Sequence, residues 1–233
     1  MAPTDQSRVS RKLICLQALL GFFANLLLAL PYLRRTHGLD KLKPLQRYLF
    51  VSNHVSLLDT ILLGALLWRS GNYPILVLGD KSVWRDSWIR NALSSPIGFL
   101  LERGKLNPGR IRELQKYAGE IKRFNLVVFP EGTRGNGVDV AECRPGIYYV
   151  AQEARATLVP IFIENMQFVS TKAEKFHPVG GLKKIEVHFG EPIPAEQYLA
   201  LPREEFTEFV RAKISALRPT PPAARLSRGL LPE

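Results

Sequence analysis

Two short polar motifs in this 233-residue chain combine side chains that could do chemistry. The first contains His54 and Asp59, an imidazole and a carboxylate five positions apart. A neutral imidazole accepts a proton near neutral pH because its unperturbed pKa is about 6.5. A carboxylate that accepts a hydrogen bond from the Nδ1–H fixes the tautomer and stabilises the imidazolium ion. The pair therefore predicts a proton-transfer device.

The spacing of this pair requires a particular local structure. On one continuous helix, five positions correspond to a rotation of about 140°, so the two side chains would diverge. They can meet if His54 lies in the turn after a strand at 48–52 and Asp59 lies in the first turns of a helix at 57–69. Ser56 suits the N-cap of that helix and lacks the G-x-S-x-G setting of a serine nucleophile. The alternative is a turn histidine and a solvated acid that favours the helix dipole.

The second motif follows another apolar, strand-like run at 125–128. After a Phe-Pro pair it reads Glu131, Gly132, Thr133 and Arg134, and two further glycines follow closely. A glycine-rich turn leaves backbone N–H groups free to face an anion, and a guanidinium group offers a planar fork for a phosphate. The alternative is an ordinary surface turn, which proline and glycine alone would explain. Together the two motifs indicate an enzyme that activates a hydroxyl group beside a phosphate.

Both motifs lie within an alternation of strand-like and helix-like runs. The strand-like runs are 48–52, 74–79, 96–101, 125–129, 158–163 and 184–190, and the helix-like runs are 57–69, 83–93, 111–124, 146–155 and 204–217. This alternation predicts an α/β fold with a mixed, mostly parallel sheet flanked by helices. Both motifs follow the carboxyl ends of strands, where open α/β sheets hold ligands.

An uncharged N-terminal segment precedes this alternation. Residues 13–33 form a run of 21 residues without a charge between Lys12 and Arg34, close to the length of about 20 residues that spans a bilayer. A spanning helix, a helix lying in one leaflet and a cleaved signal peptide all fit such a run, and basic residues at both ends leave the orientation open. We expect a membrane-associated helical segment. The predicted division is an anchor and connector at 1–42, an α/β domain at 43–217 and a loose tail at 218–233.

The composition indicates an anionic partner and a reducing compartment. The net charge of +11 fits a membrane surface, nucleic acid or an acidic carrier protein. Only Cys15 and Cys143 occur, which gives no disulfide framework. Cys143 could in principle carry an acyl group, but no histidine near it in the sequence supports that role. No cluster of histidine and cysteine predicts a metal site.

Taken in order, four sequence blocks resemble the glycerophospholipid acyltransferases typified by 1-acylglycerol-3-phosphate acyltransferase. The blocks are the N-H-x-x-x-x-D motif at 53–59, an apolar block ending in arginine at 98–103, F-P-E-G-T-R at 129–134 and V-P-I at 159–161. The resemblance implies that His54 is the general base and that Asp59 orients it. It also implies a site for the acceptor and its phosphate, which the predicted set Arg103, Glu131, Gly132, Thr133 and Arg134 would form.

The reaction that this resemblance implies is transfer of a fatty acyl group to the free hydroxyl of a lysophospholipid. The donor would be acyl-CoA or acyl-ACP (acyl carrier protein), and no acyl-enzyme, metal or other cofactor would be needed. Backbone N–H groups at the start of the helix after His54 would stabilise the oxyanion. The default acceptor is 1-acylglycerol-3-phosphate, giving phosphatidic acid. Small departures from the family blocks, at Leu57, Glu102 and after Pro160, keep a lyso-aminolipid or another lysolipid open.

Other classes of protein compete with this interpretation. A lipid-binding protein of the same fold would not need both His54 and Asp59. A nucleic-acid binder would explain the charge but not the apolar N-terminal segment, so we expect membrane lipids as partners and no nucleic acid. A thioester or lipid hydrolase that uses the same histidine is the nearest enzymatic alternative. The expected location is a membrane, at the cytoplasmic face of a bacterial inner membrane.

Overall fold

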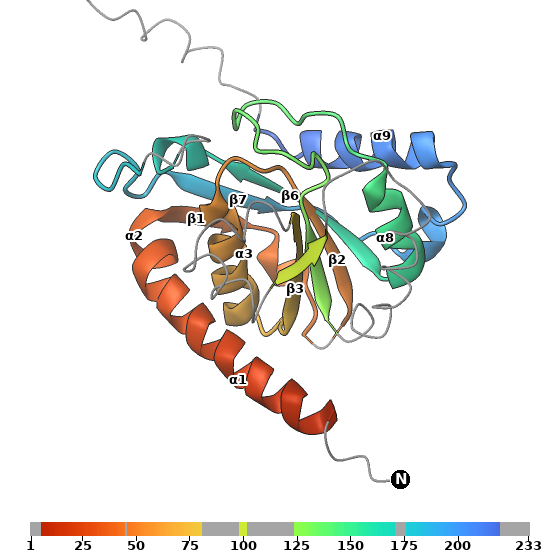
Figure 1. Ribbon diagram of the computed structural model, residues 1–233. Coiled ribbons are helices and arrows are strands. Elements are labelled where there is room, and N and C mark those ends of the chain that lie inside the picture. The colour runs from red at the N-terminus through yellow and green to blue at the C-terminus, as the bar shows by residue number, and fades with distance from the viewer. Residues whose placement is uncertain (1–5, 45, 81–97, 102–123, 171–175, 220–233) are drawn as a thin grey trace, which may run out of the picture.

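A seven-stranded sheet forms the centre of the computed structural model, which describes residues 6–44, 46–80, 98–101, 124–170 and 176–219 (Figure 1). The strand order is β1-β7-β6-β2-β5-β3-β4. Only the β6–β7 pair is antiparallel. The predicted mixed, mostly parallel sheet is therefore confirmed. The strands are β1 (Leu33–His37), β2 (Tyr48–Ser52), β3 (Ile75–Asp80), β4 (Gly98–Leu101), β5 (Asn125–Val128), β6 (Thr157–Glu164) and β7 (Ile185–Phe189).

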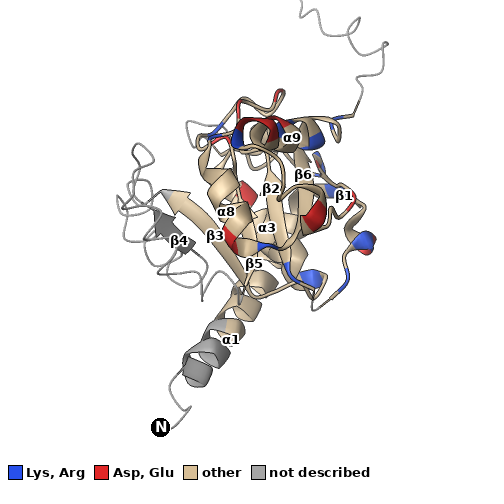
Figure 2. Ribbon diagram, turned by 90° about the vertical axis from the view of Figure 1, so that its right-hand side faces the viewer, with Lys and Arg blue, Asp and Glu red and all other residues tan. Residues whose placement is uncertain are grey.

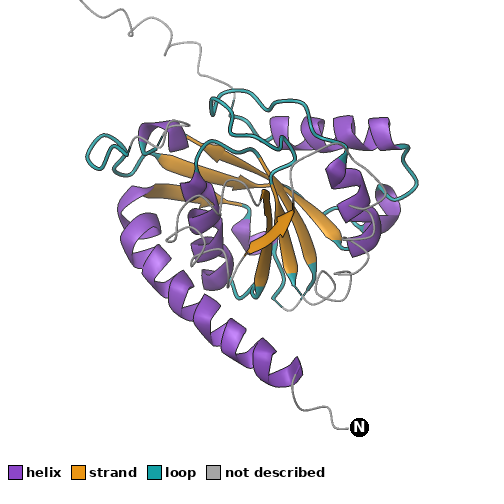
Figure 3. Ribbon diagram, viewed as in Figure 1, coloured by secondary structure: helices purple, strands orange, loops and turns teal. Residues whose placement is uncertain are grey.

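The central strands are apolar on both faces because helices cover both sides of the sheet (Figure 3). In β2, Tyr48 and Phe50 pack into the hydrophobic cluster on one face, with α3 (Leu57–Arg69). Leu49 and Val51 pack into the cluster on the other face, with α8 (Gly146–Ala154) and α9 (Arg203–Ser215). Burial on both faces fixes the central strands firmly, and with them the loops at their carboxyl ends.

Short helical turns complete the described part of the chain. They are η2 (Leu39–Lys41), η3 (Met166–Phe168) and η4 (Ala195–Gln197). The predicted helix at 83–93 and nearly all of the one at 111–124 lie outside the described residues, as does most of the predicted tail.

Strand β1 was missed by the sequence analysis, which placed residues 33–37 in the connector before the α/β domain. The structure pairs β1 in parallel with β7, with His37 beside His188. Four of its five residues are polar, namely Arg34, Arg35, Thr36 and His37, and all four are exposed or half-buried. An edge strand has one paired neighbour and a wet face, so it lacks the apolar signal of an internal strand. The sheet therefore begins at residue 33, ten residues before the predicted start of the α/β domain at residue 43.

The N-terminal helix packs against α3 of the α/β domain (Figure 1). It comprises α1 (Gln6–Ala24), a π-helical stretch η1 (Asn25–Ala29) and α2 (Leu30–Tyr32). The side chain of Gln17 donates to the carbonyl of Ile75 at 2.9 Å and accepts from its N–H at 2.8 Å. A Cβ at Gly21 would lie 2.5 Å from the ring of Trp68, so glycine permits this close approach to α3. One side of the helix is thus fixed to the domain.

Candidate active site

The structure brings His54 and Asp59 into direct contact. His54 lies in the turn after β2, and Asp59 lies in the first turn of α3. The distance from His54 Nδ1 to Asp59 Oδ2 is 2.9 Å. Ser56 is the N-cap, and its hydroxyl accepts from the N–H of Leu58 at 3.2 Å. The predicted strand, turn and capped helix therefore have the geometry that the five-residue spacing requires.

Asp59 holds the turn as well as the imidazole. Its Oδ2 also accepts from the backbone N–H groups of Val55 at 2.6 Å and Ser56 at 2.9 Å. The carboxylate is fully buried, so these donors replace water. An ionised carboxylate can only accept, so the imidazole must place its proton on Nδ1 and leave Nε2 as the proton acceptor.

Three backbone N–H groups near the start of α3 already have hydrogen-bond acceptors within the protein. The sequence analysis assigned stabilisation of the oxyanion to backbone N–H groups at the start of the helix after His54. The N–H groups of Val55 and Ser56 instead donate to Asp59, and that of Leu58 donates to the N-cap hydroxyl. The cause is the local capping chemistry, since short polar side chains compete for the first N–H groups of a helix.

The loop after β5 lies beside this turn because β2 and β5 are parallel neighbours, with Val51 opposite Val128. Phe129 stacks on the His54 ring, with centroids 4.1 Å apart and planes 20° apart. The N–H of Gly135 donates to the carbonyl of His54 at 2.6 Å. The imidazole side chain is 14% exposed. Stacking and hydrogen bonding therefore restrict the ring while a small part of it stays open to a substrate.

Glu131 joins the two loops and is almost completely buried. Its Oε1 accepts from the N–H of His54 at 2.9 Å, and its Oε2 accepts from the N–H of Ala141 at 3.2 Å. Burial raises the pKa of this carboxyl above its ordinary value, partly offset by the two backbone donors. The sequence analysis placed Glu131 in the acceptor site. Because both oxygens bind backbone groups, the structure gives it a positioning contact to His54.

Replacing Glu131 with Gln should therefore loosen the site. The amide would place an N–H group against a backbone N–H, and one buried donor would lose its acceptor. We expect the free energy of unfolding to fall by about 1–3 kcal/mol. Thermal or urea unfolding measures this loss. Glu142→Gln is the matched control, since that side chain is exposed on the same loop. Equal effects of the two substitutions would contradict the buried role of Glu131.

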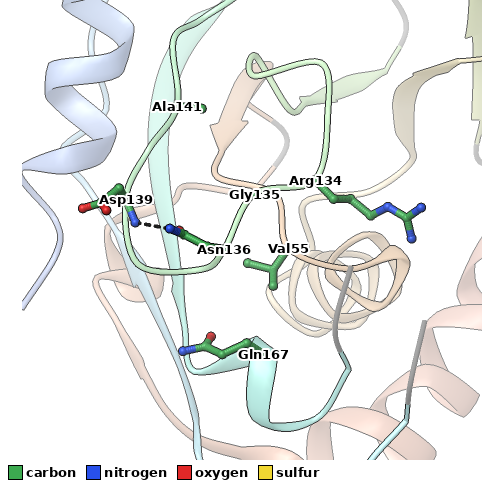
Figure 4. Close-up of a pocket in the computed structure, with 7 residues that line it drawn as sticks. All are labelled: Val55, Arg134, Gly135, Asn136, Asp139, Ala141 and Gln167. Atoms are coloured by element: carbon green, nitrogen blue, oxygen red, sulfur yellow. Dashed lines mark hydrogen bonds between the residues drawn. The ribbon is translucent and has the colours of Figure 1, made fainter. Parts of the chain in front are cut away.

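Of the remaining residues of the second motif, Arg134 lines an open cavity of about 530 Å³, and Gly132 and Thr133 are not part of that lining. Figure 4 shows Arg134 reaching away from the turn in which Asn136 accepts a hydrogen bond from the N–H of Asp139 at 3.0 Å. Gly132 adopts a φ of +64°, which favours glycine. Thr133 is half-buried beside it, and Arg103 lies outside the described residues. The complete cavity lining is Val55, Arg134, Gly135, Asn136, Asp139, Ala141 and Gln167.

Gln167 is the part of this cavity that sequence reasoning missed. It lies on η3, which follows β6, far along the chain from both motifs. Neither its residue type nor its spacing marks it. Strand β6 pairs with β2, and Asn53 fastens the two strands by bonds to the N–H and carbonyl of Ile163 at 2.7 and 3.0 Å. The sheet thus delivers Gln167 to the cavity.

A second polar cluster lies at the β1–β7 edge of the sheet. Donor atoms of His37, Glu186 and His188 lie within 4.8 Å of one another, as metal ligands would. The two imidazole planes are stacked and only 3° from parallel, so in-plane lone pairs cannot converge on one ion. His37 Nε2 lies 2.8 Å from Glu186, and this contact lowers the pKa of that carboxyl. The cluster is therefore better explained as a set of side-chain contacts that link β1 to β7.

Taken together, the fold and the site show a histidine that is held by a buried carboxylate at the edge of an α/β sheet. Comparison with known proteins identifies the class of protein. The family model described as Acyltransferase matches residues 34–164, more than half of the chain. The chain belongs to this acyltransferase family.

Individual relatives agree with this membership. The chain is 33% identical over 144 residues to a lyso-ornithine lipid O-acyltransferase of Pseudomonas aeruginosa, covering 61% of this chain and 51% of the relative. It is 26% identical over 170 residues to the 1-acyl-sn-glycerol-3-phosphate acyltransferase of Saccharomyces cerevisiae, covering 70% and 53%. The chain thus spans about half the length of the curated relatives it matches.

A solved structure shows the same fold. The 1-acyl-sn-glycerophosphate acyltransferase PlsC from Thermotoga maritima aligns with a TM-score of 0.60. The alignment covers 92% of this chain and 83% of that one, at 16% sequence identity. At such low identity the likeness extends to the fold alone.

Proposed function

We propose that this protein transfers a fatty acyl group from a thioester to the free hydroxyl of a lysophospholipid. The observation that carries the proposal is the bond from His54 Nδ1 to buried Asp59, which leaves Nε2 as a base. His54 directly precedes Val55, which lines the cavity. Membership of the acyltransferase family indicates that the transferred group is an acyl group. The proposed donor is acyl-CoA or acyl-ACP.

In the proposed reaction, His54 Nε2 removes the proton from the acceptor hydroxyl as its oxygen attacks the thioester carbonyl. The tetrahedral intermediate collapses to an ester, the carbon–sulfur bond breaks, and the imidazolium returns its proton to the departing thiolate. Asp59 stabilises the imidazolium between these two steps. Binding the two substrates next to each other lowers the activation barrier further, because it makes the attack effectively intramolecular.

No acyl-enzyme on Cys143 is proposed. The thiol is buried, and burial raises its pKa to about 12. A thiolate is the nucleophilic form, so a thiol with so high a pKa is inert near neutral pH.

The proposed acceptor is 1-acylglycerol-3-phosphate, which would give phosphatidic acid. Arg134 at the cavity supports an anionic headgroup. A lyso-ornithine lipid is a second candidate, favoured by the 33% identity to the enzyme named for it. Purified protein incubated with a labelled acyl donor and a panel of lysolipids tests the assignment, with each product identified by mass. Acylation of lyso-ornithine lipid alone would replace the first acceptor with the second.

Arg134→Ala should weaken acceptors that carry a phosphate near the reacting hydroxyl. Charge-assisted hydrogen bonds to a guanidinium contribute about 2–3 kcal/mol, so KM for such an acceptor should rise by a factor of roughly 30 to 150. An uncharged lysolipid should be affected far less. Arg144→Ala is the matched control, because that arginine is exposed on the same loop but does not line the cavity. An equal loss with both kinds of acceptor would give Arg134 a structural role instead.

We also propose that the N-terminal helix attaches the enzyme to a membrane. Residues 14–32 form a helix that is long and apolar enough to cross a bilayer by length and composition alone. The part of this helix at residues 14–32 carries no charged residue (Figure 2). Exposed apolar side chains recur along one face of it at helical spacing, and we call them the helix stripe: Leu16, Leu19, Phe23, Leu26, Leu27 and Leu30. Because the opposite face packs on α3, we propose that the helix lies in one leaflet.

Membrane lipids and the acyl donor are the proposed partners, and the cytoplasmic face of a bacterial inner membrane is the proposed location. Lipid phosphates are then the anionic partner that the net charge of +11 fits, and nucleic acid is the alternative partner. Such a location also suits thioester donors and the two unpaired cysteines.

Substitutions in the helix stripe should change how salt affects membrane binding. Deletion of the whole N-terminal segment would be less informative, because it would expose the face of α3 that the helix covers and would remove part of β1. In Leu19→Ser/Phe23→Ser/Leu27→Ser, residual binding should depend on Lys and Arg, at about 1 kcal/mol each, and should fall at high salt. Binding of the unchanged protein should resist high salt because apolar burial is not screened. Sedimentation with liposomes at low and high salt measures both. If the unchanged protein washes off as easily as the variant, the helix is no anchor.

A further inference from the structure

A second group of exposed apolar side chains lies on the segment between β6 and β7. We call Phe168, Phe176, Val179 and Leu182 the loop patch. Each is at least 46% exposed, and Val179 is 78% exposed. Large apolar side chains that gather on a surface mark a site of interaction more often than isolated ones do.

The backbone that presents the loop patch is held in place. Phe176 forms an isolated antiparallel bridge with Ser170, and the N–H of His177 donates to the carbonyl of Val169 at 2.8 Å. A Cβ at Gly181 would lie 2.4 Å from a methyl group of Val169, so the segment packs closely on the domain. The described residues of this segment are bonded to the domain, yet their apolar side chains are exposed, which fits a partner that supplies an apolar medium.

The loop patch continues the apolar surface of the N-terminal helix. The Phe176 ring meets the edge of Tyr32 at the end of α2, with centroids 5.9 Å apart. The backbone N–H of Lys183 donates to the carbonyl of Pro31 at 3.0 Å, and its ammonium group bonds to the carbonyl of Leu30. In Figure 1 the segment before β7 projects beyond the α2 end of the helix. A flat partner that touches the helix stripe can therefore touch the loop patch as well.

Cations border this surface. Lys183 and Lys184 are exposed beside Leu182, and Arg34 and Arg35 are exposed just beyond α2. The Lys184 ammonium lies 5.0 Å from the centre of the Phe168 ring. Apolar side chains with Lys and Arg at their margin match the boundary between acyl chains and anionic headgroups. Among the described residues, Glu186 is paired with Arg34 at 3.3 Å, and Glu164 lies opposite Glu186 across the β6–β7 pair.

We propose that the loop patch is a second membrane contact, which enters the headgroup region of an anionic bilayer beside the N-terminal helix. The inference rests on the proposed attachment of that helix to a membrane. It also has a consequence for the site. Gln167 lines the cavity and is followed directly by Phe168 of the loop patch. Contact at the loop patch would thus hold the cavity next to the bilayer surface, where a lysolipid acceptor resides.

An environment-sensitive fluorophore on Val179→Cys tests the contact directly. Labelling requires Cys15→Ser, because Cys15 is exposed, whereas Cys143 is buried. The control probe is Lys213→Cys on α9, which packs on the opposite face of the sheet from α3 and the N-terminal helix. With vesicles of phosphatidylglycerol and phosphatidylethanolamine, the emission from position 179 should shift to the blue and that from position 213 should not. Vesicle-bound protein without a shift at 179 would overturn the inference but leave the helix attachment intact, and failure to bind vesicles would overturn both.

A substitution series measures how much the contact contributes. Val179→Ser/Leu182→Ser should lower the partition coefficient onto the same vesicles about tenfold or more. Lys184→Gln should lower it about fivefold, and only at low salt. Lys213→Gln is the matched control, since its ammonium lies 5.3 Å from the ring of Phe209 in the same kind of contact. Thermal unfolding should be unchanged in all three variants, and equal binding by all of them would overturn the inference.

The same variants separate this inference from the proposed function. In detergent micelles the acceptor no longer needs to be reached at a bilayer, so acyl transfer by Val179→Ser/Leu182→Ser should equal that of the unchanged protein. Loss of vesicle binding together with full micelle activity is the expected result. Absence of acyl transfer in every protein, with normal vesicle binding, would reject the proposed reaction and leave the membrane contact standing.

Discussion

Replacing His54 with Ala should abolish measurable acyl transfer while leaving the fold intact. General-base catalysis contributes about 100- to 10,000-fold, so kcat should fall by a factor in that range. The side chain stacks on Phe129 and bonds to Asp59, but the backbone bonds of the turn belong to Asp59 and Glu131 and survive the substitution. Initial rates with saturating acyl donor, together with circular dichroism, measure both effects.

His177→Ala is the control for this experiment, because it makes the same substitution at an exposed histidine away from the cavity. We expect it to retain full activity in detergent micelles. If His54→Ala keeps more than about a tenth of the rate, the loss is too small for a general base, and the assignment fails.

Asp59→Asn should also lower both kcat and stability strongly, because of the contacts that this carboxylate makes. Three donors converge on Oδ2, so the amide oxygen should take that position. The amide NH₂ would then replace Oδ1, which is buried without a hydrogen-bond partner in the described part of the chain. The tautomer of His54 would survive, but the charge that stabilises the imidazolium would be lost, and a buried donor would stay unsatisfied. We expect kcat to fall about 100-fold or more and stability to fall by about 1–3 kcal/mol.

Ser56→Ala separates the stability effect from the catalytic one. It removes the N-cap and the hydrogen bond to Ser170 but leaves the bond from His54 to Asp59 in place. Loss of the cap should cost about 1 kcal/mol of stability with little change in kcat. If Ser56→Ala and Asp59→Asn lower kcat equally, the effect of Asp59 would come from loosening of the turn.

The contact between His54 and Asp59 could be predicted from the sequence because every step of it is local. An apolar strand, a polar turn and a capped helix start are encoded within a dozen residues, and the structure has all three. The central strands were equally clear, since burial on both faces demands an unbroken apolar run. Strand β1 was missed because its partner β7 lies about 150 residues away and its own residues are mostly polar.

The roles that sequence reasoning missed depend on which loops the sheet places side by side. Glu131 was assigned to the acceptor site because a carboxylate beside an arginine fits either role. Only the parallel pairing of β2 with β5 shows that it binds the N–H of His54. Gln167 reaches the cavity through the pairing of β6 with β2. The N-terminal run predicted an apolar helix, but the contacts of Gln17 and Gly21 with the domain had no signal in the sequence.

The ratio of acylated lysolipid to released thiol distinguishes acyl transfer from hydrolysis. Purified protein is given a donor with a labelled acyl chain and an excess of lysolipid, and released thiol, acylated lysolipid and free fatty acid are quantified together. We expect one acylated lysolipid for each thiol released, and neither product above background with His54→Ala. Release of thiol with free fatty acid and no acylated lysolipid would show a hydrolase. Acylated lysolipid formed at an undiminished rate by His54→Ala would contradict the mechanism.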